Sequence, residues 1–258
     1  KWILDTQGIR NGSPWLALIW FCGTVPVTLL LLRAFPQPYG WLPDGARAAP
    51  GEIANISGTP LAEAVRSRFY KAVTFGYIFA LGAQVGGALQ LVKLVEERTD
   101  RSTATLATIV LSTMSILSRF AAGRIIPKIN MTRFTVGLAG LQGISLASLG
   151  LINNRIGLLI AIGLFGVTIG NMVMMQSLLL AERFGVRDYP KIAARSGLIS
   201  FSGTALGPLL LGWLYDVAGG YRSSYLAAGA CSIIGAILFS FAGSASVAST
   251  EVASAQSQ

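Results

Sequence analysis

Residues 156–181, IGLLIAIGLFGVTIGNMVMMQSLLLA, form an apolar stretch without a single charged side chain. A helix that spans the hydrocarbon core of a membrane needs about 20 mainly apolar residues, and this stretch exceeds that length. Six further stretches of the same kind are separated from it by short charged segments, at 14–33, 69–94, 103–120, 134–152, 196–215 and 222–243. The sequence therefore predicts an all-α membrane protein, a multi-span helical bundle whose solvent is lipid.

The composition agrees with this prediction, because 53% of the residues are hydrophobic and only 12% are charged. Soluble domains carry about 25% charged residues. The net charge of +9 comes from small basic groups at the ends of the stretches. No long basic run that could follow a phosphate backbone occurs, so we expect no nucleic-acid partner.

Few residues could support catalysis or bind a metal. The sequence contains no histidine, and Cys22 and Cys231 both lie inside apolar stretches, so we expect no metal, no cofactor and no disulfide. The acidic pairs, histidines or Ser–Lys pairs of membrane enzymes are missing from the stretches, and so is the phosphate-binding loop G-x-x-x-x-G-K-[ST]. We therefore expect no enzymatic activity.

The basic residues predict the orientation of the chain in the membrane. Alternate connections place thirteen of the 20 Lys and Arg residues on one side and seven on the other. Cytoplasmic loops carry the excess of Lys and Arg. We expect the C-terminus to be cytoplasmic, in a multi-pass protein of the bacterial inner membrane.

The stretches divide the chain into four parts. Residues 1–33 hold an extracytoplasmic loop and one helix, and the proline-rich segment 34–68 reads as a cytoplasmic linker. Residues 69–243 hold six helices, and the Ser- and Ala-rich tail 244–258 is predicted to be disordered and cytoplasmic. A lone helix, a linker and six helices are expected if the chain is the second part of a longer transporter, whose N-terminal half is its partner.

Glycines recur at four-residue spacing in several stretches, for example at Gly82 and Gly86 and again at Gly203 and Gly207. Small residues at this spacing let helix backbones approach closely in lipid. One interpretation is tight static packing, and the other is that smooth glycine faces let helices slide or bend. Pro208 is a candidate flex point.

The most specific motif is SRFAAGRIIPKIN at 118–130, followed by Arg133. It resembles the second copy of the loop signature of the major facilitator superfamily. We expect Gly123 to allow close helix contact. The same interpretation has Arg124, Lys128 and Arg133 hold the turn in the headgroup region as part of a gate. A proline, Pro127, replaces the aspartate of that signature.

A second match begins at Gly197 and includes GWLYD at 212–216 and GGY at 219–221. It resembles the last helical hairpin of the monocarboxylate and oxalate/formate branches of that superfamily. The segment 36–43 is similar to the start of the linker in the oxalate/formate branch. The resemblance implies two six-helix bundles with a solute bound between them, and access that alternates as the bundles rock. This chain would supply the last helix of the first bundle and all of the second.

Arg119 is the charged residue that lies deepest in a predicted span. The resemblance implies that an arginine here contacts an anionic substrate, and the planar fork of a guanidinium suits a carboxylate. The alternative is that its side chain snorkels to the interface. Ser115 replaces an aspartate of the monocarboxylate branch, and 196–215 lacks the lysine of the oxalate/formate pattern. We therefore expect a monoanion or a neutral solute.

Four uncharged polar residues are further candidates for the substrate site, namely Tyr77, Gln84, Asn171 and Gln176. A closed cavity needs such groups to hydrogen-bond a small solute. Each of them can instead form hydrogen bonds between helices, which are worth about 0.6 kcal/mol in membranes. Tyr77 and Gln84 are seven residues apart, which places them on one helix face.

These features together predict a secondary active transporter of a small organic solute, with a monocarboxylate as the leading candidate. The alternative is a transporter-like membrane sensor or assembly protein without flux, which the proline at position 127 favours.

Overall fold

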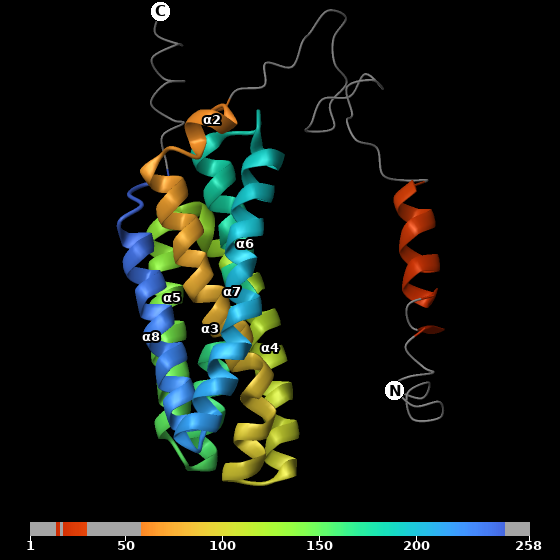
Figure 1. Ribbon diagram of the computed structural model, residues 1–258, viewed down its shortest axis with the longest axis vertical. Helices are drawn as coiled ribbons and strands as arrows, with labels where there is room; N and C mark the ends of the chain where they lie inside the picture. The colour runs from red at the N-terminus through yellow and green to blue at the C-terminus, as the bar shows by residue number, and fades with distance from the viewer. Residues whose placement is uncertain (1–13, 16–17, 30–57, 246–258) are drawn as a thin grey trace, which may run out of the picture. The chain divides into compact units, whose positions relative to one another are not determined.

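The computed structural model describes residues 14–15, 18–29 and 58–245, which are mainly helical (Figure 1). Six helices are long and apolar enough to cross a membrane. They are α3 (Arg68–Arg98), α4 (Arg101–Ile125), α5 (Met131–Leu151), α6 (Arg155–Phe184), α7 (Tyr189–Ala218) and α8 (Tyr221–Ser240). The short α2 (Leu61–Ala64) precedes them, and the 3₁₀ helix η2 (Ile126–Lys128) joins α4 to α5. The six spans predicted within 69–243 are confirmed, as is an all-α bundle with the lengths and composition of membrane helices.

The part of the chain before the bundle is described only in short pieces. Leu18–Leu29 form an apolar helix within the predicted first span, 14–33, and belong to a unit separate from the bundle. Most of the predicted linker, up to residue 57, lies outside the described residues, and so does the predicted tail from residue 246.

Polar residues just before four of the long helices determine where these helices begin. Ser67, Asp100, Asn130 and Asn154 each accept a hydrogen bond from the backbone N–H three residues further on. A side-chain oxygen in this position satisfies an N–H group that has no partner inside the helix. At Asp100, hydrogen bonds from Ser102 and then Thr103 hold the pKa of the carboxyl well below its ordinary range. This cap therefore stays charged at neutral pH.

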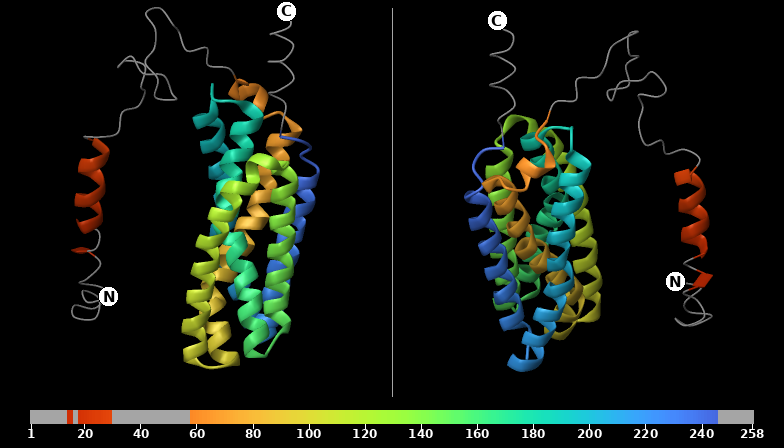
Figure 2. Two further views of the ribbon diagram at one scale, coloured as in Figure 1. Left: turned by 180° about the vertical axis from the view of Figure 1, so that it is seen from behind. Right: turned by 45° about the horizontal axis from the view of Figure 1, so that its top comes forward.

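The six helices divide into two triplets, α3–α4–α5 and α6–α7–α8, whose main contacts join one triplet to the other. α3 packs mainly on α7 and α8, whereas α6 packs mainly on α4 and α5, and α5 packs along α8. Exchanging the triplet α3–α4–α5 with α6–α7–α8 reproduces these main contacts. Successive helices reverse direction (Figures 1 and 2), so the first helices of the two triplets run in opposite directions. The bundle consists of two inverted three-helix repeats.

Glycines allow the backbones of α3 and α7 to touch. A Cβ atom added at Gly82 would lie 3.0 Å from the carbonyl oxygen of Gly203. A Cβ atom added at Gly203 or Gly207 would collide with the carbonyl oxygen of Ile78 or Gly82, respectively. Such contact is a main source of helix association in lipid, where no hydrophobic force drives it. The predicted tight packing is confirmed, whereas a sliding motion stays a prediction. α7 continues as a helix through Pro208.

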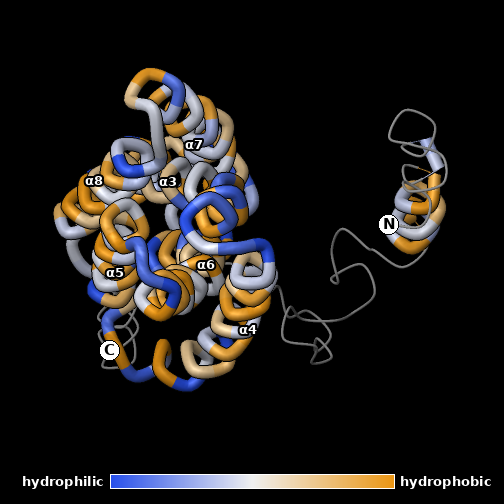
Figure 3. Tube along the Cα trace, turned by 90° about the horizontal axis from the view of Figure 1, so that it is seen from below, coloured by the Kyte–Doolittle hydropathy of each residue, from blue (hydrophilic) through white to orange (hydrophobic). Residues whose placement is uncertain are grey.

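Charged residues divide unevenly between the two ends of the bundle. α2, η2 and the turn between α6 and α7 lie at one end (Figure 1), with basic residues such as Arg66, Arg124 and Arg187. Among the described residues, Glu63, Glu182 and Asp188 are the acidic residues at this end, whereas Glu96, Glu97, Asp100 and Asp216 belong to the opposite end. Figure 3 shows the hydrophilic residues concentrated in the turns rather than along the helices. We call the end that carries α2 the basic end.

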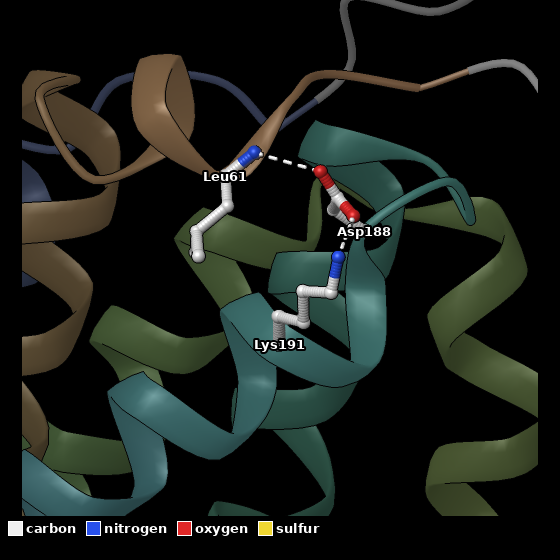
Figure 4. A network of polar contacts seen from close by, with 3 residues as sticks. All are labelled: Leu61, Asp188 and Lys191. Atoms are coloured by element: carbon white, nitrogen blue, oxygen red, sulfur yellow. Dashed lines mark hydrogen bonds and ion pairs between the residues drawn. The ribbon is translucent and has the colours of Figure 1, made fainter.

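The segment before α3 is fixed to the turn between α6 and α7 (Figure 4). Gly58 pairs with Gly185 in an isolated antiparallel bridge, and the backbone N–H of Thr59 donates to the carbonyl oxygen of Phe184 at 2.8 Å. Asp188 accepts hydrogen bonds from the backbone N–H of Leu61 and from Lys191 Nζ, each at 3.0 Å. The hydrogen bond from Leu61, and to a smaller extent that from Lys191, lowers the pKa of the Asp188 carboxyl.

The α3–α7 crossing can be tested with two glycine-to-alanine substitutions. Both Gly203→Ala and Gly137→Ala remove a helical glycine, which favours the helix by up to about 1 kcal/mol. A Cβ atom at Gly203 would strike the backbone of α3, whereas one at Gly137 meets no atom within 4 Å. We expect Gly203→Ala to lower the free energy of unfolding by about 1–3 kcal/mol. Gly137→Ala should preserve it or raise it by up to about 1 kcal/mol, with both measured by denaturation in detergent micelles. Equal stabilities of the two variants would contradict a backbone contact at this crossing.

The contact of Asp188 with Leu61 should depend on pH. Since the folded-state pKa of Asp188 is lowered, the contribution of its carboxylate to the stability of the fold is fully present above the ordinary aspartate pKa of about 3.9. It is lost as the pH falls through the lowered value. At neutral pH we expect Asp188→Ala to increase hydrogen exchange at the amide of Leu61 several-fold, measured by mass spectrometry. Lys191→Ala keeps the bond to Leu61 and serves as the control, because exposed ion pairs contribute little. Equal exchange in the two variants would contradict the assignment.

Candidate functional site

The candidate site lies where α4 crosses α6, and glycines again set the distance. A Cβ atom added at Gly166 would lie 2.6 Å from the carbonyl oxygen of Leu111, and one at Gly170 would collide with that of Ser115. The backbones of the two helices are therefore in contact. This crossing corresponds to the α3–α7 crossing when the two triplets are exchanged. It brings two predicted site residues, Arg119 on α4 and Asn171 on α6, to the same place.

Arg119 is anchored through one of its three guanidinium nitrogens. Its Nε donates a hydrogen bond to the carbonyl oxygen of Gly170 at 2.8 Å. Its two Nη nitrogens have neither an ion pair nor a hydrogen bond within the described part of the chain, and the side chain is exposed on α4. The anchor orients the guanidinium and leaves both terminal nitrogens available to a carboxylate, which they can bind with two parallel hydrogen bonds.

Asn171 is almost fully buried, with 1% of its surface exposed. Its Nδ2 donates to Ser118 Oγ at 3.1 Å and to the carbonyl oxygen of Val167 at 2.9 Å. Its Oδ1 is buried and has no hydrogen-bond partner. A buried acceptor without a partner costs about 1–3 kcal/mol, so this oxygen is available to a donor from a ligand.

A pocket of about 600 Å³ opens beside Asn171 between α4, α5 and α6. Its walls are mostly apolar, and its polar residues are Ser118, Asn171 and, toward the basic end, Arg133. Arg119 does not line it. The structure therefore brings Arg119 and Asn171 to one crossing, but it does not place both side chains in one pocket.

Two other predicted residues form hydrogen bonds between helices. Tyr77 is fully buried and its hydroxyl donates to the carbonyl oxygen of Met172 at 3.0 Å, which ties α3 to α6. Gln176 donates through Nε2 to Ser196 Oγ at 3.2 Å and to Ser200 Oγ at 2.9 Å on α7. Both side chains have their hydrogen bonds within the bundle, so the packing interpretation describes them better than the cavity interpretation.

Gln84 differs from these two residues. Only 6% of its surface is exposed, and its Oε1 is buried without a hydrogen-bond partner. It shares the buried side of α3 with Tyr77, as their spacing predicts, but it lines none of the pockets described here. Gln84 and Asn171 are therefore the two predicted residues with an unused buried oxygen.

The loop motif lies between two helices as predicted, but the described residues do not provide the helix contact predicted at Gly123. Arg124, Lys128 and Arg133 are exposed at the basic end, around η2. The expectation that Gly123 allows close helix contact is wrong for the described residues, because a Cβ atom there would meet nothing within 4 Å. Gly123 lies on an exposed part of α4, the helix with the smallest buried share of the six. Pro127 lies inside η2 and helps to end α4.

Three residues outside the predicted site have structural roles. Ser118 connects Asn171 to α4, and Gln142 on α5 donates through Nε2 to the carbonyl oxygen of Ala80 and to Ser232 Oγ, each at 2.8 Å. Arg98 donates to the carbonyl oxygens of Leu149 at 2.6 Å and Ile152 at 2.7 Å, which caps the end of α5. A glutamine inside an apolar stretch is a visible signal for Gln142, whereas the role of Arg98 depends on which helix ends meet.

Neither the family models nor the curated proteins compared with this chain match it. The interpretation of the site therefore rests on its own geometry.

Proposed function

We propose that the chain belongs to a secondary active transporter of a small organic solute, built like the second half of a major facilitator superfamily protein. The observation that carries this proposal is the pair of inverted three-helix repeats, whose main contacts with each other are reproduced when the two triplets are exchanged. Many secondary transporters are built from such repeats, and they bind their substrates near the middle of the membrane. The proposed energy source is a solute or ion gradient.

The exposure of α4 and α7 supports a second bundle as partner. In their most apolar windows only 17% and 22% of the residues are buried, against 44–56% in the other four spans. These two helices occupy equivalent positions in the two repeats. α5 and α8 bury each other by direct packing, whereas α4 and α7 leave most of their surface exposed. The proposed occupant of this exposed surface is the N-terminal half of the same transporter, with the solute bound between the halves.

Arg119 on α4 is the proposed contact for an anionic solute. It lies six residues before the end of α4 at Ile125, which is about 9 Å along a helix. Insertion of an arginine costs about 2.5–3.5 kcal/mol at the membrane centre and less near the interface. The anchored Nε and the two free Nη nitrogens favour a monocarboxylate over a neutral solute. A carboxylate would replace the missing ion-pair partner of this side chain.

The excess of basic residues at one end supports an orientation. Since Lys and Arg are retained in the cytoplasm, the proposal places the basic end and the C-terminus of the chain inside the cell. The proposed location is the inner membrane of a bacterium.

The role of Arg119 can be tested by transport measurements on the full-length transporter in proteoliposomes. We expect Arg119→Gln to reduce uptake of radiolabelled monocarboxylates by at least about tenfold, because loss of a charge-assisted hydrogen-bond pair costs more than about 1.4 kcal/mol. Arg119→Lys keeps the charge but loses the fork, so it should restore only part of the uptake.

Arg155→Gln is a matched control, because it removes an exposed arginine from the opposite end of the bundle. Uptake by Arg119→Gln equal to that of the control would remove the proposed role of Arg119. Absence of flux for a broad panel of anionic and neutral solutes would favour a transporter-shaped sensor or assembly protein instead.

A further inference from the structure

A second, separate pocket lies at the basic end, on the outer side of α3 and α8. It has a volume of about 400 Å³ and is lined by Arg66, Arg68, Lys71, Ala72, Phe75 and Leu238. Three of the six lining residues are cations, and none is acidic. None of them belongs to the proposed solute site at the α4–α6 crossing.

The three cations of this pocket have no acidic partner in the described residues, where the one ion pair joins Lys191 to Asp188. The guanidinium of Arg68 lies over the ring of Phe241, with its Cζ 5.9 Å from the ring centroid. Arg68 and Lys71 belong to the first turn of α3, which contains no acidic residue. The helix dipole disfavours cations at this end and favours an anion. No described acidic side chain forms an ion pair with these cations, and this includes Glu63 on α2, three residues before Arg66.

The apolar part of the pocket continues from the cations toward the middle of the bundle. Phe75 lies seven residues after Arg68, about 10 Å along the helix, and 51% of its surface is exposed. Leu238 on α8 lies beside it in the same pocket. Phe79, one turn further along the same face of α3, lines another apolar pocket of about 400 Å³. A free phosphate would leave this apolar surface unused.

We propose that this pocket binds an anionic phospholipid, with its phosphate at Arg66, Arg68 and Lys71 and an acyl chain along Phe75 and Leu238. Basic pockets between membrane helices bind anionic headgroups because each cation attracts them and the neighbouring apolar wall accepts the chain. The occupant comes from the leaflet at the basic end. It is a structural or regulatory partner of the bundle, distinct from the transported solute.

The proposal can be tested by native mass spectrometry of the whole chain, released from detergent that contains phosphatidylglycerol or phosphatidylcholine. We expect one molecule of phosphatidylglycerol to remain bound per protein. The triple variant Arg66→Gln, Arg68→Gln, Lys71→Gln should weaken this binding on the order of 100-fold, since each cation contributes about fivefold. The control removes three exposed cations from the same end but outside the pocket, as Arg124→Gln, Lys128→Gln, Arg187→Gln, and should retain the lipid.

Two outcomes would overturn the proposal. Equal loss of phosphatidylglycerol from the pocket variant and the control would show only general attraction of a basic surface for anionic lipid. Retention by the pocket variant would show that another surface, or a part of the chain outside the described residues, accounts for binding. The variant Phe75→Ala keeps all three cations, and unchanged retention would exclude the acyl-chain contact. Each variant is compared only if it elutes from gel filtration as the unmodified chain does.

Discussion

Contact between helix backbones at glycine is the interaction on which the rest of this structure depends. An apolar side chain gains little free energy when it exchanges lipid for the surface of another helix, because both surroundings are apolar. Helix association in a membrane therefore depends on close packing and hydrogen bonds. The crossings of α3 with α7 and of α4 with α6 both bring a glycine against a backbone carbonyl of the partner helix. Exchange of the two triplets converts one crossing into the other, so one type of contact joins the triplets at two equivalent places.

The same contact positions the polar side chains. At the α4–α6 crossing it places Gly170 where its carbonyl oxygen can accept from Arg119 and places Ser118 against Asn171. Polar groups that are hydrogen-bonded inside the bundle, such as those of Tyr77 and Gln176, link one helix to another. The buried oxygens of Asn171 and Gln84 found none. Gln142 also has a buried oxygen without a partner, although its Nε2 links helices. An unused buried oxygen therefore marks a candidate for binding only where a pocket adjoins it, as at Asn171.

The fold could be predicted from the sequence to the level of its spans, since a run of about 20 apolar residues has few other uses. The packing partners of each helix could not be predicted, because glycine spacing identifies a contact face but not the helix that packs against it. This is why Gly123 was assigned a contact that the described residues do not provide. The sequence leaves both interpretations open for Tyr77 and Gln176, because their hydrogen-bond partners lie on helices distant along the chain. Asn130 and Asn154 cap α5 and α6, and Pro127 lies in the turn before α5, so these residues act within their own part of the chain.

The most direct test is the sidedness of single cysteines in intact cells, with Cys22 and Cys231 replaced by serine. An impermeant thiol reagent should label Asn153→Cys, in the turn between α5 and α6, from outside. It should label Lys128→Cys and Arg187→Cys only after the membrane has been opened. Labelling of Asn153→Cys and Lys128→Cys from the same side would contradict a bundle in which α5 crosses the membrane, and with it the inverted repeats.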